Sequence, residues 1–175
     1  MLHVNLNDLL EYTDWERAKW HTLLQQHGPE VLKVSAGPHG DGRFAAVGDL
    51  IRHIFSAEKR YVERLAGRAL TDTSTLATDD LDALFAFGRK SRQELRQFID
   101  TFAPEQWDVP HEFTLMNSFL RATPRKIMIH VVIHEIRHWA QIGTLLRLQG
   151  VIGEFHDFLF SPVLGGEFRR GQSGS

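Results

Sequence analysis

Apolar residues recur at helical spacing along four stretches of the chain, and each stretch predicts an amphipathic helix. The first stretch runs from about Leu6 to Gln26 and is closed by Gly28-Pro29. The second runs from about Phe44 to Gly67. The third opens near Thr78-Asp-Asp, where acidic side chains suit a helix N-cap, and runs to about Phe102.

The fourth stretch has the clearest boundaries. Thr123 is a favourable N-cap residue, Pro124 suits the first helical position, and Gly150 stands just past the expected end. The interval predicts a helix of roughly seven turns.

The segments between these helices carry weaker signals. The glycine-rich stretch 35–42 predicts a loop, and 111–115 alternates enough for a short strand or an extended loop. Residues 155–160 predict a short fifth helix or loop at the C-terminal end. Four long amphipathic helices without strand–helix alternation predict an all-α fold, a four-helix bundle. We expect one domain over residues 1–162 and a flexible tail over 163–175.

Composition limits the classes of protein to which this chain could belong. The chain has 175 residues, 42% of them hydrophobic, which suits one globular domain. Its net charge is −2 and its pI is about 6.5, so no broad basic field favours a nucleic-acid partner. It has no cysteine, so a protein-bound metal needs His, Asp, Glu or carbonyl ligands. Such ligands favour Zn, Ni, Mn or Fe.

Targeting signals are not evident in the sequence. The N-terminal residues lack the basic region and apolar stretch of a signal peptide. No uninterrupted apolar run approaches the ~20 residues of a membrane span. We therefore expect a cytoplasmic protein that does not bind membranes.

Three histidines stand at four-residue spacing in the fourth predicted helix: His130, His134 and His138. Residues at i, i+4 and i+8 share one helix face, and two imidazoles one turn apart can bind the same metal ion. Random placement of ten histidines gives about 0.6 such pairs, so one pair alone is weak evidence. Two consecutive pairs in a strongly helical segment are stronger evidence for a metal site.

The segment His134-Glu135-Ile-Arg-His138 also matches the H-E-x-x-H pattern of zinc peptidases, in which Glu135 would be the general base. The longer form of that pattern fails, because Gln141 and Thr144 stand where glycine and histidine are required. Glu154 is a conceivable third ligand but lies past the helix end. Since the chain also offers almost no sheet, we regard a peptidase as the less favoured alternative.

In a helical bundle the third ligand comes from a neighbouring helix, and His53 is the obvious candidate. It lies mid-helix beside the apolar residues Leu50, Ile51 and Ile54. One histidine facing an i,i+4 pair makes a three-histidine site with an open position, the usual layout of a catalytic metal site.

At this point the sequence resembles a known family. The segments Leu50-Ile-Arg-His53-Ile-Phe-Ser-Ala-Glu58 and Ile129-His-Val-Val-Ile-His134-Glu-Ile-Arg-His138-Trp-Ala-Gln141, with Leu145-Leu-Arg147-Leu-Gln-Gly150, resemble the DinB-like (DinB/YfiT) superfamily. Its members are four-helix-bundle metalloenzymes, and the resemblance extends from Leu6 to about Phe160. Many relatives read His-Arg-Gly-Gln after the last ligand, whereas Trp139 and Ala140 stand between His138 and Gln141 here.

The resemblance implies particular roles. His53, His134 and His138 match the metal ligands, most commonly of Zn or Ni, and His130 occupies the preceding turn without being a main ligand. Relatives are associated with S-transfer that uses a low-molecular-weight thiol or with metal-dependent hydrolysis, others act as maleylpyruvate isomerases, and many have no assigned activity. A homodimer is a further expectation. A non-catalytic, stress-related metal-binding bundle remains the alternative.

Three neutral imidazoles leave the charge of a divalent ion uncompensated, which favours an anionic fourth ligand such as hydroxide or thiolate. Several other residues are candidates for supporting roles. Asp49 is placed to accept the second ring N–H of His53. Glu135 is a weak candidate general base that equally fits a position facing a neighbouring helix. The remaining candidates for the pocket lining are Tyr12, Asp14, Trp15 and Asp157. The basic residues of the third predicted helix are expected on its exposed face: Arg89, Lys90, Arg92 and Arg96.

Overall fold

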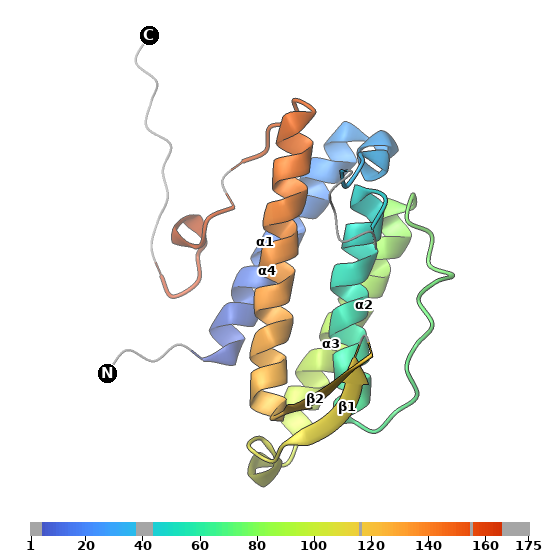
Figure 1. The fold of residues 1–175 in the computed structure, drawn as a ribbon. Helices are drawn as coiled ribbons and strands as arrows, with labels where there is room; N and C mark the ends of the chain where they lie inside the picture. The colour runs from blue at the N-terminus through green and yellow to red at the C-terminus, as the bar shows by residue number, and fades with distance from the viewer. Residues whose placement is uncertain (1–4, 38–43, 116, 155, 166–175) are drawn as a thin grey trace.

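The computed structural model describes residues 5–37, 44–115, 117–154 and 156–165, and four long helices dominate it (Figure 1). These helices are α1 (Leu6–His27), α2 (Val47–Leu65), α3 (Leu81–Thr101) and α4 (Pro124–Leu148). Helix α2 lies between α3 and α4, and α1 closes the ring against the same two helices. The predicted all-α four-helix bundle is confirmed. Within the described residues, no helix is both long and apolar enough to cross a membrane.

The helix ends follow from local hydrogen bonding. Helix α1 begins with a capping box, in which Asn5 accepts from the amide of Asp8 and the carboxylate of Asp8 accepts from the amide of Asn5. Thr123 caps α4 and Pro124 takes its first position, as predicted. Helix α2 begins at Val47, three residues later than predicted, because residues 45 and 46 pair with the chain near Ser35.

The shorter elements depart more from the sequence-based expectations. A 3₁₀ turn, η1 (Pro29–Lys33), follows α1. Strand β1 (His111–Leu115) forms where a strand or extended loop was expected, and it pairs antiparallel with β2 (Ser118–Ala122), which the sequence analysis did not predict. In place of a fifth helix, the described residues after α4 form a 3₁₀ turn, η3 (Phe158–Phe160), and a further 3₁₀ turn, η2 (Pro104–Gln106), follows α3. The predicted loop residues 38–42, Phe155 and the tail residues 166–175 lie outside the described residues.

The hydrophobic core consists of two clusters stacked along the bundle. The cluster nearer Leu24 includes Trp20, Ile54, Phe55, Leu84, Phe85, Trp139 and Ile142. The cluster nearer Leu10 includes Tyr61, Val62, Leu95, Phe98, Met128 and Val131. In every helix a charged residue falls between the two clusters: Arg17, Glu58, Arg92 and Glu135, all less than a tenth exposed. We call these four residues the ionic layer.

The C-terminal segment covers a cavity of about 670 Å³ between α1 and α4. The Tyr12 hydroxyl donates to the carbonyl of His156 (2.7 Å), and the His156 ring stacks on Trp20 with centroids 4.2 Å apart. Glu16 lines this cavity, and its Oε2 atom has no hydrogen-bond partner among the described residues. Burial raises the pKa of Glu16 to about 8, although the Trp20 indole donates to its other oxygen.

We expect Glu16 to make stability depend on pH. The pKa of this group is raised from 4.5 to about 8 in the folded protein, so the folded state binds an extra proton between these values. The stabilisation is therefore complete below pH 4.5 and is lost as the pH rises through 8. Glu16→Gln keeps the side chain neutral. The unfolding free energy of this variant minus that of the wild type should increase by about 1–3 kcal/mol from pH 6 to pH 9.

Urea unfolding at both pH values measures this difference. The matched control is Glu11→Gln, at an exposed position of the same helix, which should show little change with pH relative to the wild type. A Glu16→Gln difference that stays constant from pH 6 to pH 9 would contradict the assignment of a protonated Glu16.

Candidate metal centre

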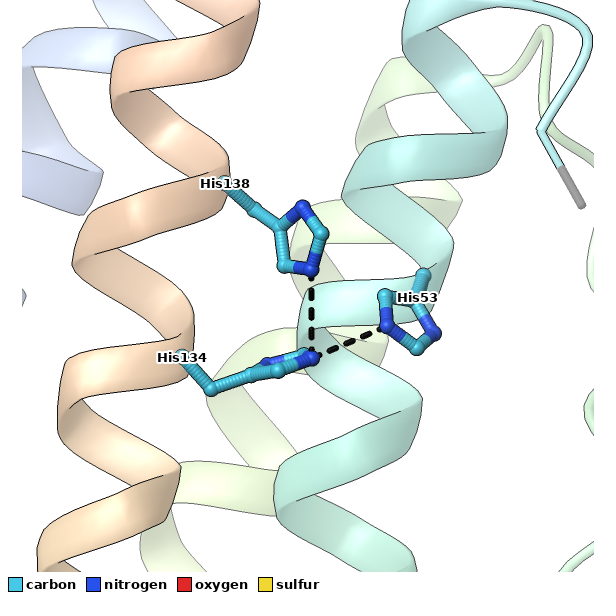
Figure 2. A group of neighbouring side chains, drawn as sticks. All are labelled: His53, His134 and His138. Atoms are coloured by element: carbon cyan, nitrogen blue, oxygen red, sulfur yellow. Dashed lines mark hydrogen bonds between the residues drawn. The ribbon is translucent and has the colours of Figure 1, made fainter. Parts of the chain in front are cut away.

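Three imidazoles from two helices converge on one point (Figure 2). His53 comes from α2, and His134 and His138 come from successive turns of α4. The Nε2 atom of His134 lies 2.9 Å from that of His53 and 3.2 Å from that of His138. One nitrogen from each ring lies within 4.8 Å of the other two, and His134 and His138 are both buried.

These distances fit a shared metal ion. Histidine nitrogens bind zinc at about 2.0–2.1 Å, so two ligands at about 90–110° are about 2.9–3.4 Å apart. His138 Nδ1 lies 3.0 Å from the amide oxygen of Gln141, an arrangement that leaves Nε2 as the lone-pair atom facing the other rings. Three ring nitrogens at this spacing cannot all be satisfied by one another, because a neutral imidazole carries one N–H. The donor set therefore suits a divalent cation.

Electrostatics keep the central ligand neutral. The pKa of His134 falls to about 2, chiefly because burial disfavours the charged ring and also because His138 and His53 lie beside it. A neutral ring retains the lone pair that a metal needs. Phe44 packs against His53 with ring centroids 4.6 Å apart and covers one side of the cluster.

His130 lies one turn before His134 and outside the cluster. Its ring centroid is 5.5 Å from that of His134, and its Nε2 atom is 3.5 Å from the hydroxyl of Tyr61. This placement agrees with the role that the family resemblance implied for His130, adjacent to the ligands without belonging to them.

The other candidate residues are engaged elsewhere. Asp49 accepts from the amides of residues 45 and 46 and pairs with Arg52, so its carboxylate stabilises the N-terminal end of α2. Asp14 pairs with Arg92 and Arg96, and Asp157 caps η3 by accepting from Leu159. Tyr12 and Trp15 line cavities beside α1. The structure does not bring these residues to the histidines.

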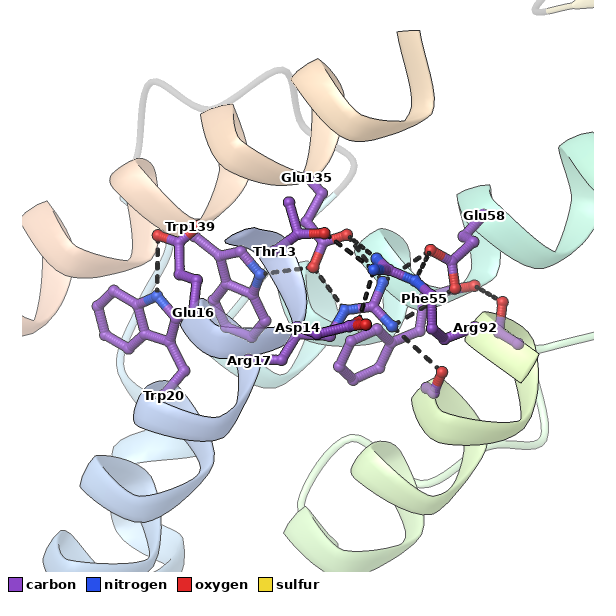
Figure 3. A network of polar contacts seen from close by, with 12 residues as sticks. Thr13, Asp14, Glu16, Arg17, Trp20, Phe55, Glu58, Arg92, Glu135 and Trp139 are labelled. Atoms are coloured by element: carbon purple, nitrogen blue, oxygen red, sulfur yellow. Dashed lines mark hydrogen bonds and ion pairs between the residues drawn. The ribbon is translucent and has the colours of Figure 1, made fainter. Parts of the chain in front are cut away.

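Glu135 points into the bundle interior instead of toward the histidines (Figure 3). Its carboxylate accepts from Arg17 Nε (2.5 Å), Arg92 Nη2 (2.7 Å) and the Trp139 indole (3.1 Å). Burial alone would raise the pKa of Glu135, but the two arginines outweigh it and hold the pKa below its usual value. The peptidase alternative needs this carboxylate beside the metal ligands, and the geometry does not provide it.

The four residues of the ionic layer form a closed ring of ion pairs. Arg17 and Arg92 each pair with both Glu58 and Glu135, so one side chain from each helix joins a ring with balanced charge. Arg92 also donates to Thr13. The expectation that Arg92 lies on the exposed face of α3 is wrong, since it is 6% exposed.

The sequence does contain a signal for the ionic layer. Arg17 stands three residues before Trp20 and seven after Leu10, at an inward-facing position of α1. Each of the other three helices likewise has a charged residue at such a position: Glu58, Arg92 and Glu135. A charged residue at the same depth in all four helices indicates one buried network of ion pairs. The alternative would be four unrelated charged residues, each on the solvent-exposed face of its helix.

The DinB family is the family whose model matches this chain, over residues 1–163. A search of curated proteins finds no match.

We expect purified protein to carry close to one divalent metal ion per chain. His53→Ala and His138→Ala should each lower the metal affinity by more than about 100-fold, beyond the effect of losing a residue that only orients a ligand. His130→Ala is the matched control and should keep its metal. Mass spectrometry of bound metal, with circular dichroism to confirm folding, measures this. Metal retention by His53→Ala would show that α2 supplies no ligand.

We expect the ionic layer to be needed for stability. Arg92→Leu leaves two buried glutamates with one arginine, and the unfolding free energy should fall by about 3–5 kcal/mol. Arg96→Leu, one turn further along α3 with a half-exposed pair to Asp14, is the control and should cost about 0–1 kcal/mol. Denaturant unfolding distinguishes the two. Equal losses in both variants would contradict the account.

Proposed function

The chain belongs to the DinB family, and on this premise we propose that it is a metal-dependent enzyme that transfers a small-molecule thiol to an electrophile. The observation that carries the proposal is the meeting of three Nε2 atoms from α2 and α4. A three-histidine set leaves coordination positions open, which a purely structural site normally does not. We further propose Zn or Ni as the metal, since both accept imidazole ligands.

His53, His134 and His138 would hold the metal. His134 contributes a neutral ring from the buried face of α4, and Gln141 fixes the orientation of His138. A divalent ion bound there lowers the pKa of a thiol or water molecule that binds to it and so supplies a nucleophile at neutral pH.

The surroundings favour a thiol over water as the nucleophile. The described residues that line the pocket beside His53 and His134 include no carboxylate. Activation of water then has no carboxylate general base in this lining, and His130 is the lining histidine outside the cluster, whereas a thiol can lose its proton directly to solvent. Hydrolysis of a small substrate is the second candidate, because three imidazoles alone also suffice to activate water at zinc.

A paired assay tests the proposal. Metal-loaded protein is mixed with 1-chloro-2,4-dinitrobenzene and a thiol, and thioether formation is followed as the C–S bond forms and chloride leaves. We expect turnover that needs both metal and thiol and falls about 100-fold or more in His138→Ala. His130→Ala, which alters a neighbouring ring outside the cluster, should remain active.

A second assay with p-nitrophenyl acetate and no thiol identifies hydrolysis. Metal-dependent ester cleavage combined with no thiol transfer would favour the hydrolase. Metal-loaded protein that is inactive in both assays would overturn the enzymatic proposal and favour a non-catalytic metal-binding protein.

A further inference from the structure

A pocket of about 260 Å³ opens beside two of the three histidines. Its walls come from α2, α4 and β1, and His53 and His134 form the part nearest the metal centre. This volume suits a compact ligand of few atoms.

Three arginines line this pocket: Arg60 and Arg64 from α2, and Arg137 from α4. None of the three forms an ion pair with a carboxylate of the described residues, unlike Arg17, Arg92 and Arg125. The positive charges of these arginines lower the pKa values of neighbouring groups. Burial and the neighbouring Arg60 lower the pKa of Arg64, and Arg137 contributes to the lowered pKa of His130. Glu63 and Asp72 act on Arg64 and Arg60 at longer range, but neither pairs directly with them. Adjacent positive charges without a direct ion pair favour an anion that lies between them.

A buried hydroxyl provides an independent observation. Ser56, one turn of α2 from Arg60, lines the same pocket and is 7% exposed. Its Oγ atom is shielded from solvent and has no hydrogen-bond partner in the part of the chain that the structure describes. A buried hydroxyl without a partner costs free energy, and a ligand oxygen in the pocket would satisfy it.

One guanidinium is already held in place. Arg64 lies over the rings of Tyr61 and Phe113, at 5.8 and 5.5 Å from their centroids. Stacking of this kind orients the planar fork of an arginine, which binds the two oxygens of a carboxylate or phosphate together.

We propose that this pocket binds the carboxylate or phosphate group of a small anionic substrate whose reactive end reaches the three histidines. This inference rests on the proposed function and specifies its substrate class. A divalent ion on three neutral ligands adds further positive charge beside the arginines, so an anion is favoured and a cationic or neutral substrate is not.

Matched thiols test the inference without relying on catalysis. Metal-loaded protein is titrated with 3-mercaptopropionate and with 2-mercaptoethanol by calorimetry at about 0.15 M salt, where weak long-range attraction is screened. We expect the carboxylate-bearing thiol to bind about tenfold more tightly or better, a difference of 1.4 kcal/mol. The double variant Arg60→Gln/Arg137→Gln retains Arg64, so it should lose most of this preference, and it should keep its metal.

Arg147→Gln is the control, because it removes the same charge from α4 at a position lining the cavity between α1 and α4. It should retain the preference for 3-mercaptopropionate. Equal binding of the two thiols by metal-loaded wild type, or a preference that is undiminished in the double variant, would overturn the inference while leaving the metal centre and thiol binding intact.

A second titration separates this inference from the proposed function. Protein stripped of metal by a chelator is titrated with inorganic phosphate and with propionate. Binding of either anion that is lost in Arg60→Gln/Arg137→Gln supports the pocket even if no thiol transfer is found, and the tighter anion identifies the group accepted. If the stripped wild type binds neither anion, the arginine pocket is not an anion site.

Discussion

The ring of ion pairs between Arg17, Glu58, Arg92 and Glu135 is the constraint on which the arrangement of the four helices depends. Each helix supplies one charge, and each charge lies between two hydrophobic clusters that would tolerate small shifts along the bundle axis. A charge that slipped by one turn would be buried without its partners, at a cost of several kcal/mol. We infer that the ionic layer fixes the register of the four helices.

The same layer determines which face of α4 meets α2. Glu135 and Trp139 turn inward to Arg17, Arg92 and Trp20. His134 and His138 each precede one of these inward residues, and a rotation of about 100° per residue sets them on the adjacent face, toward His53. The Trp139 that departs from the pattern of many relatives thus has a structural role, since its indole donates to Glu135 and its ring stacks on Trp20.

Local signals predicted the parts of the structure that depend on nearby residues. Thr123 and Pro124 define the start of α4, and the four-residue histidine spacing places two imidazoles together whatever surrounds them. Features that depend on residues far apart in the chain were missed. The pairing of β2 with β1 arises from tertiary placement, and the burial of Arg92 from partners 34 or more residues away. The H-E-x-x-H pattern made Glu135 a candidate general base, with a position facing a neighbouring helix as the alternative, but the pattern cannot show that two arginines from other helices bind its carboxylate.

The central claim is a single metal ion held jointly by α2 and α4, and anomalous X-ray scattering from a crystal of the metal-loaded protein tests it most directly. Data collected on both sides of the absorption edge of the bound metal identify the element and locate it. The account predicts one anomalous peak per chain, within about 2.0–2.2 Å of the Nε2 atoms of His53, His134 and His138. A peak bound by His130 or Glu135 in place of His53, or no peak between the two helices in fully loaded crystals, would contradict it.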